Sequence, residues 1–239
     1  MRKKIIAGNW KMNYCVNKAE NFVMEIKDRI NTDEVDVVIC PNFVSLDRVS
    51  DAIDGTNIKL GAQNVYFEDK GAYTGETSVN MLSAVGVSYC IVGHSERRQY
   101  FNETNEIVNK KAKKLLEKDI APIVCVGETL EERESDKMFE VVEKQVKESL
   151  DGIDEQSIKN KVVQSIYSCS QYFCTGNLKK QYTMKQKNHN LSVKRRIYSF
   201  PQEDESRAEA ICRAFKLYTL VEWAAYTKVD IRIETSKNY

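Results

Sequence analysis

The segment Tyr89 to Phe101, YCIVGHSERRQYF, brings together the residue types that could perform acid–base chemistry. A short apolar run meets a glycine, and His94, one of only two histidines in the chain, follows directly, before Ser95, Glu96 and two arginines. Parallel α/β proteins collect such side chains at the carboxyl end of a strand. We therefore interpret this segment as a catalytic centre. The alternative is a strand that ends in a solvated charged loop with a structural histidine.

Polar residues also follow three other predicted strands. Asn9 and Lys11 follow the first strand, Gln63 and Asn64 follow the third, and Glu128 follows the fifth. Convergence of several strand ends on one face is typical of an eight-stranded barrel. No GxGxxG follows the first strand, so the pattern gives no support to a dinucleotide-binding open sheet.

Strands and helices alternate through the first 150 residues, which predicts an α/β fold. Strands this uniformly apolar are buried on both faces of a parallel sheet. Asn17 could cap the first helix, with Glu20 three residues later. Strands are expected at residues 3–7, 35–40, 58–62, 89–92 and 121–126, with a sixth beginning near Val162. Helices are expected at 17–30, 44–53, 79–85 and 104–118, and a long one runs through Met138 to about residue 150.

The composition predicts a soluble globular protein, with 42% apolar and 30% charged residues. No apolar run reaches the eighteen or so residues of a membrane span, and the amino terminus lacks a signal-peptide pattern. We therefore expect a cytoplasmic protein without a membrane partner. Seven cysteines without a CxxC pair favour reduced thiols over disulfides or a metal site.

Charge and glycine content divide the chain near residue 160. Residues 1–160 carry 22 Lys and Arg against 28 Asp and Glu, whereas residues 161–239 carry 14 against 7. Nine of the ten glycines lie at or before Gly152. Such a break predicts a domain boundary. We expect five βα units in 1–160 and an atypical basic tail in 161–239, with a possible helix at about 206–223.

Five motifs in this order and spacing resemble the triosephosphate isomerase family. They are GNWKMN, GAQNVY, GAYTGETS, IVGHSERR and VCVGETLEER, at residues 8–13, 61–66, 71–78, 91–98 and 124–133. The resemblance covers about residues 1–160. It implies a (β/α)8 TIM barrel that works as a homodimer without metal or cofactor. It also implies that dihydroxyacetone phosphate and glyceraldehyde 3-phosphate are interconverted in glycolysis and gluconeogenesis.

The resemblance also implies roles for the residues of the first and fourth motifs. His94 is the neutral electrophile that polarises the substrate carbonyl, and this family is itself the established example of such a histidine. Lys11 supplies positive charge to the substrate phosphate and the oxyanion, and Asn9 donates a hydrogen bond at the same place. Ser95 and Glu96 support the site from behind His94.

A dimer interface is implied in the same way. Glu76 and Arg97 resemble the ion pair between subunits. Thr74 resembles the residue at the tip of the loop that enters the neighbouring subunit, near Asn13 and Cys15.

The chain departs from the family after about residue 160. The family's catalytic base is a glutamate after strand six, and no glutamate occurs here between Glu155 and Glu203. The glycine turns that hold the phosphate after strands seven and eight are also absent, so strands six to eight are degraded or missing. A tail translated in an alternative reading frame would explain these losses, and the DNA sequence tests this idea.

Two further alternatives stay open. The chain could be a catalytically inactive relative that keeps dimer or ligand binding. The basic tail, with lysines and arginines interleaved with tyrosines, could bind nucleic acid. We rank nucleic-acid binding last, because charge runs are usually solvated faces.

Overall fold

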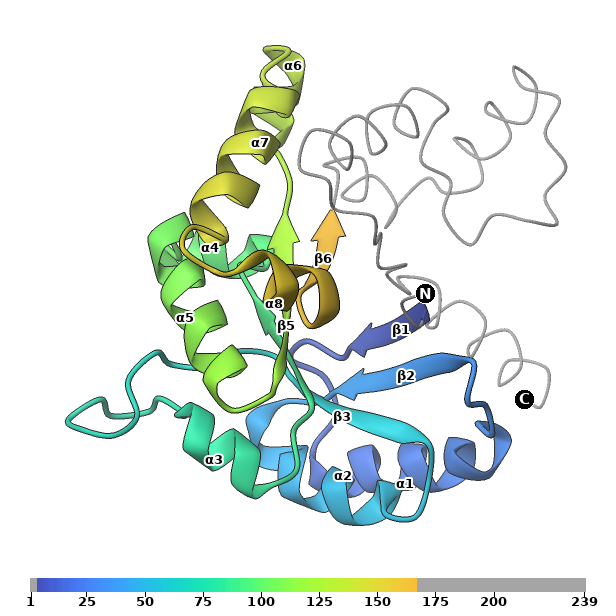
Figure 1. Ribbon diagram of the computed structural model, residues 1–239. Coiled ribbons are helices and arrows are strands. Elements are labelled where there is room, and N and C mark those ends of the chain that lie inside the picture. Colours follow the sequence, from blue (N-terminus) through green and yellow to red (C-terminus); the bar gives the residue numbers. More distant parts are fainter. Residues whose placement is uncertain (1–3, 167–239) are drawn as a thin grey trace, which may run out of the picture.

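The structure, a computed structural model, describes residues 4–166, and these form a sheet of six parallel strands. Each strand pairs with the next one along the chain, from β1 to β6. Figure 1 shows β1 and β6 at the two ends of this order. The strands are β1 (Lys4–Asn9), β2 (Val35–Cys40), β3 (Ile58–Ala62), β4 (Tyr89–Val92), β5 (Ala121–Val126) and β6 (Val163–Ile166).

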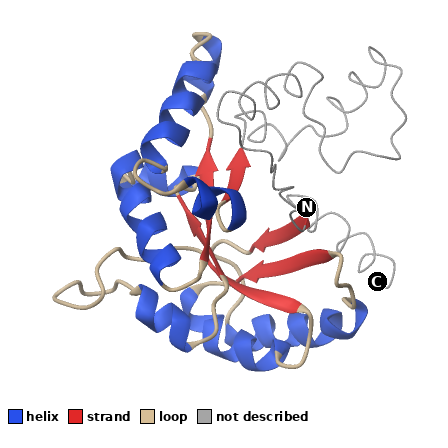
Figure 2. Cartoon of the chain, in the orientation of Figure 1, coloured by secondary structure: helices blue, strands red, loops and turns tan. Residues whose placement is uncertain are grey.

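Helices link the strands, as crossover connections in a parallel sheet require. In Figure 2 they lie on the outer side of the curved sheet. The α-helices are α1 (Val16–Ile26), α2 (Leu46–Ile53), α3 (Val79–Ala84), α4 (Ser95–Phe101), α5 (Asn105–Glu117), α6 (Leu130–Glu134), α7 (Met138–Ser149) and α8 (Glu155–Asn160). Two short 3₁₀ helices are η1 (Lys27–Arg29) and η2 (Phe43–Ser45).

Both faces of the sheet carry buried apolar residues, as expected for strands that are largely apolar without alternation. Along β5, Ile123 and Cys125 belong to the smaller apolar cluster, whereas Val124 and Val126 belong to the larger one. The larger cluster includes apolar residues of α1, α2, α5 and α7, so it joins the sheet to its helices. Successive strand residues point to opposite faces, and each face therefore has its own core.

The predicted α/β fold of five consecutive parallel strands is confirmed, and the sixth strand forms at Val163–Ile166. The helix predicted at 104–118 is also confirmed, and Thr104 caps it by accepting the amide hydrogen bond of Ile107. The predicted tail helix at 206–223 lies outside the described residues. Within residues 4–166, no helix is long and apolar enough to cross a membrane.

One local prediction was wrong. Asn17 does not cap α1, because the helix begins at Val16 after Cys15, whose side chain makes no capping bond. The long helix predicted through Met138 to about residue 150 forms as α7, and a separate short helix, α6, precedes it. The chain turns between them at Asp136, whose φ of 57° is incompatible with a continuous right-handed helix. A helix that was not predicted, α4, follows His94 directly.

Candidate active site

The polar residues predicted to converge do so at the carboxyl ends of three strands. Lys11 follows β1, and its Nζ lies 2.7 Å from Oε1 of Glu96, which follows β4. Gln63 follows β3, and its Nε2 donates to the carbonyl of Lys11 at 2.9 Å. Glu128, after β5, pairs instead with Arg133 at 3.6 Å. The structure thus brings three of the four predicted strand ends into direct contact.

The turn after β1 is held by side-chain amides. Lys11 has a φ of 53°, a left-handed conformation that is uncommon for a residue with a Cβ. Its backbone N–H donates to Oδ1 of Asn9 at 2.9 Å. Nε2 of Gln63 also donates to the carbonyl of Cys40 at 2.8 Å, which ties this turn to the end of β2. These bonds fix the backbone of Lys11, while its side chain stays 49% exposed.

The turn after β4 is held by charged side chains. Gly93 has a φ of 72°, and a Cβ there would come within 3.0 Å of Arg98 and of the carbonyl of Cys125. Its N–H donates to Oε1 of Glu103 at 3.0 Å, and its carbonyl accepts from Nε of Arg98 at 2.8 Å. Only glycine fits this position without strain, and it leads directly into His94.

His94 is the N-cap of α4, and its ring nitrogen Nδ1 accepts the backbone N–H of Glu96 at 3.2 Å. A nitrogen that accepts a hydrogen bond carries no proton, so the neutral ring holds its proton on Nε2. Burial lowers the pKa of His94, and Lys11 lowers it further, whereas the carboxylates of Glu96 and Glu103 raise it. Burial prevails, and the ring is therefore neutral near pH 7.

The arrangement suits a reaction in which negative charge develops on oxygen. A neutral imidazole N–H and an ammonium group lie at one edge of the sheet, joined through Glu96. Preorganised donors and cations of this kind stabilise an oxyanion in the transition state. Ser95 begins α4 beside them, and its predicted supporting role stays a prediction.

Sequence reasoning missed a buried charged cluster behind His94. Glu103 is 4% exposed and Lys111 3%, and Nζ of Lys111 lies 3.3 Å from the Glu103 carboxylate and 2.8 Å from Oδ1 of Asn64. The pattern that could have revealed this cluster is the position of Lys111 in α5. Its neighbours on the buried face of the helix are Val108, Ala112 and Leu115. A lysine on that face requires a buried partner.

The predicted interface residues occupy exposed loops or the edge of the site. Thr74 and Glu76 lie in the segment between β3 and α3, which projects from the body in Figure 1. Asn13 follows Lys11, and Cys15 has an exposed thiol. Nε of Arg97 donates to the Glu103 carboxylate at 2.6 Å within the same chain. The predicted pairing of Arg97 with Glu76 of a second subunit stays a prediction.

A family model described as Triosephosphate isomerase matches residues 4–165, more than half of the chain. The chain belongs to the triosephosphate isomerase family. The match includes β6 as far as Ser165 and therefore extends about five residues beyond the predicted boundary at 160.

Members of the triosephosphate isomerase family from several organisms are similar to this chain. The triosephosphate isomerase of Alkaliphilus oremlandii is 53% identical over 163 residues, and that of Clostridium botulinum is 51% identical. Each alignment covers 68% of this chain and 66% of the relative. A crystal structure of triosephosphate isomerase from Bartonella henselae superposes with a TM-score of 0.63 and 36% identity, over 70% of this chain and 68% of that one. The chain thus matches just under two thirds of the length of these curated relatives.

Proposed function

We propose that this chain acts on triose phosphates and interconverts dihydroxyacetone phosphate and glyceraldehyde 3-phosphate through an enediolate. The observation that carries the proposal is the hydrogen bond from the Glu96 backbone to Nδ1 of His94. It makes His94 a neutral Nε2–H donor, which suits polarisation of a carbonyl. Family membership supplies the substrate class.

Each residue of the site then has a defined chemical role. The Nε2–H group of His94 donates to the substrate carbonyl and stabilises the charge that develops on its oxygen. Lys11 provides a compact positive charge for the phosphate and the oxyanion, and Asn9 donates a hydrogen bond beside it. Glu96 accepts from Lys11 at 2.7 Å and orients its ammonium group. No metal or cofactor is part of this proposal.

A second candidate is a catalytically inactive relative that keeps ligand or dimer binding. The sequence favours it because no acidic residue occurs between Glu155 and Glu203, where the family has its base. Loss of a positioned base slows proton transfer by about 10²- to 10⁴-fold. The proposed reaction is therefore expected to be slow in this chain.

An isomerase assay on the purified full chain tests the first candidate against the second. The proposal predicts turnover that is roughly 10²- to 10⁴-fold below that of a complete family member, and the His94→Asn variant should abolish what remains. Absence of turnover combined with binding of dihydroxyacetone phosphate supports the inactive relative. Turnover equal to that of a complete member would show that another residue replaces the base.

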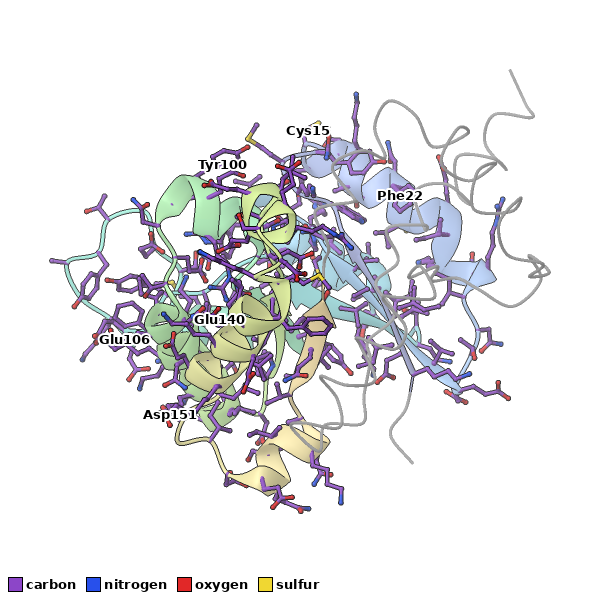
Figure 3. The ribbon with its side chains drawn as sticks, turned by 90° about the horizontal axis from the view of Figure 1, so that it is seen from above. Cys15, Phe22, Tyr100, Glu106, Glu140 and Asp151 are labelled. Atoms are coloured by element: carbon purple, nitrogen blue, oxygen red, sulfur yellow. The ribbon has the colours of Figure 1, made fainter. Side chains whose placement is uncertain are left out.

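We also propose a cytoplasmic homodimer that uses the loop of Thr74 and Glu76 and the region of Asn13, Cys15 and Arg97. Exposed apolar side chains support this assembly, since Met12 is 97% exposed and Tyr100 is 64% exposed. Figure 3 shows Cys15 and Tyr100 along the same edge of the molecule. Sedimentation should give a dimer, and Thr74→Arg should give a monomer. A monomeric wild-type chain would contradict the proposal.

A further inference from the structure

Glu103 contacts three parts of the chain that surround His94. It follows Asn102, whose left-handed backbone ends α4, and it is almost fully buried. Its Oε2 accepts from Nε of Arg97 at 2.6 Å, and its Oε1 accepts the Gly93 N–H at 3.0 Å. Nζ of Lys111, on α5, lies 3.3 Å from the same Oε1. One carboxylate therefore links the end of β4 to α4 and α5.

The bond to Gly93 acts on the residue directly before His94. The N–H of Gly93 is held by Glu103, and its carbonyl is held by Nε of Arg98 at 2.8 Å. Rotation of the peptides on either side of Gly93 would break both bonds. The direction in which the chain enters His94 is thus set by two side chains and not by the sheet ladder.

The direction of the backbone at Gly93 decides whether Nδ1 of His94 reaches the Glu96 N–H at the start of α4. The bond from the Glu96 N–H to Nδ1 is 3.2 Å long, so a modest shift of the ring would lose it. We propose that Glu103 is a positioning residue for His94: by holding the Gly93 peptide, its carboxylate keeps Nδ1 on the Glu96 N–H and the ring proton on Nε2. The catalytic meaning of this inference rests on the proposed isomerase function.

Glu103 could instead act on His94 through its charge alone. A carboxylate favours the protonated ring, and Glu103 indeed raises the pKa of His94, although less than burial lowers it. The two roles predict different results when the side chain is changed. Removal of the charge lowers the pKa of His94, whereas release of the ring toward solvent or toward Glu96 raises it.

Two substitutions separate these roles. Glu103→Asp keeps the charge but is one methylene shorter, so it withdraws the carboxylate from the Gly93 N–H. Glu103→Gln keeps the length and an acceptor oxygen but removes the charge. Glu106→Gln, on the exposed side of α5, serves as the control. Nitrogen-15 NMR of the full chain follows the tautomer and titration of His94, and His94→Asn assigns its signals because the chain has only two histidines.

The proposal predicts that Glu103→Asp raises the pKa of His94 and mixes its two tautomers. Glu103→Gln should keep the Nε2–H tautomer with an equal or lower pKa, and Glu106→Gln should match the wild type. A His94 that is unchanged in Glu103→Asp overturns the proposal. If Glu103→Asp does not fold, Glu103→Gln decides: a raised pKa or mixed tautomers overturns the proposal, and a retained tautomer supports it. None of these readouts requires turnover, so they remain separate from the isomerase assay.

Discussion

The turn after β4 is anchored by buried charges, whereas the turn after β1 is anchored by neutral amides nearer the surface. Gly93 is held by Glu103 and Arg98, while Lys11 is held by Gln63 through one backbone carbonyl. Buried ionic contacts are stiff, because any displacement leaves a charge without its partner. His94 is therefore held through its backbone by charged side chains, whereas Lys11 has a fixed backbone and a half-exposed side chain whose ammonium group contacts Glu96. This division suits the proposed roles, in which His94 donates to one substrate carbonyl and Lys11 lies at a more open position beside the phosphate.

The largest effect is expected from Glu103→Ala. It leaves Lys111 buried without its carboxylate, and removal of one partner from a buried pair costs about 3–5 kcal/mol. Urea denaturation should show this loss in the free energy of unfolding. Glu106→Ala, on the exposed face of α5, the helix that carries Lys111, should change it little. Equal effects of the two substitutions would show that the β4 turn is not held by its buried charges.

The dependence of the unfolding free energy on pH, at acidic values, tests the contribution of the Glu103 carboxylate. Burial alone would raise the pKa of Glu103, but Lys111, the Gly93 N–H and Arg97 together hold it below its usual range. A carboxyl group with a lowered folded-state pKa stabilises the fold fully above its unfolded pKa of about 4.3, and loses this contribution as the pH falls through the folded value. The difference in unfolding free energy between wild type and Glu103→Gln should therefore be constant above about pH 4.3 and shrink below it. A difference that grows on acidification would contradict this assignment.

A smaller effect is expected from Gln63→Ala in the β1 turn. It removes two hydrogen bonds, to the carbonyls of Lys11 and Cys40, each worth about 0.5–1.5 kcal/mol. The unfolding free energy should fall by about 1–3 kcal/mol. Asn57→Ala is the matched control, because within residues 4–166 its amide makes a single long contact, at 3.5 Å, with Asn31 at the surface. If Gln63→Ala lowers the unfolding free energy as much as Glu103→Ala does, the two turns are anchored equally strongly and the comparison is wrong.

The smallest effect on stability is expected from Lys11→Met. An exposed ion pair such as Lys11 with Glu96 contributes about 0–1 kcal/mol. Binding of dihydroxyacetone phosphate should nevertheless weaken by roughly 10- to 100-fold, because a hydrogen bond to a charged group is worth about 1.5–3 kcal/mol. Calorimetric titration measures this loss. Unchanged affinity would remove Lys11 from the proposed site.

The sequence predicts the parallel fold and the meeting of Lys11, Glu96 and His94 because polar residues after buried strands gather at one edge of a sheet. It does not predict the role of Glu103, since an acidic residue in FNETNE resembles any solvated loop. Its burial depends on Lys111 and on Gly93, which come together only in the folded chain. The start of α1 was missed because no side-chain cap marks it, since Cys15 precedes the helix without a side-chain capping bond.

We propose that His94 is a fixed, neutral hydrogen-bond donor to a substrate carbonyl, even though no acidic residue occurs between Glu155 and Glu203, where the family has its base. Infrared spectroscopy of dihydroxyacetone phosphate bound to the full chain tests this claim without any need for turnover. We predict that the carbonyl stretch of the bound substrate shifts to lower frequency and that His94→Asn restores it to the value in solution. Bound substrate with an unshifted carbonyl stretch, or a shift that survives His94→Asn, would contradict the account.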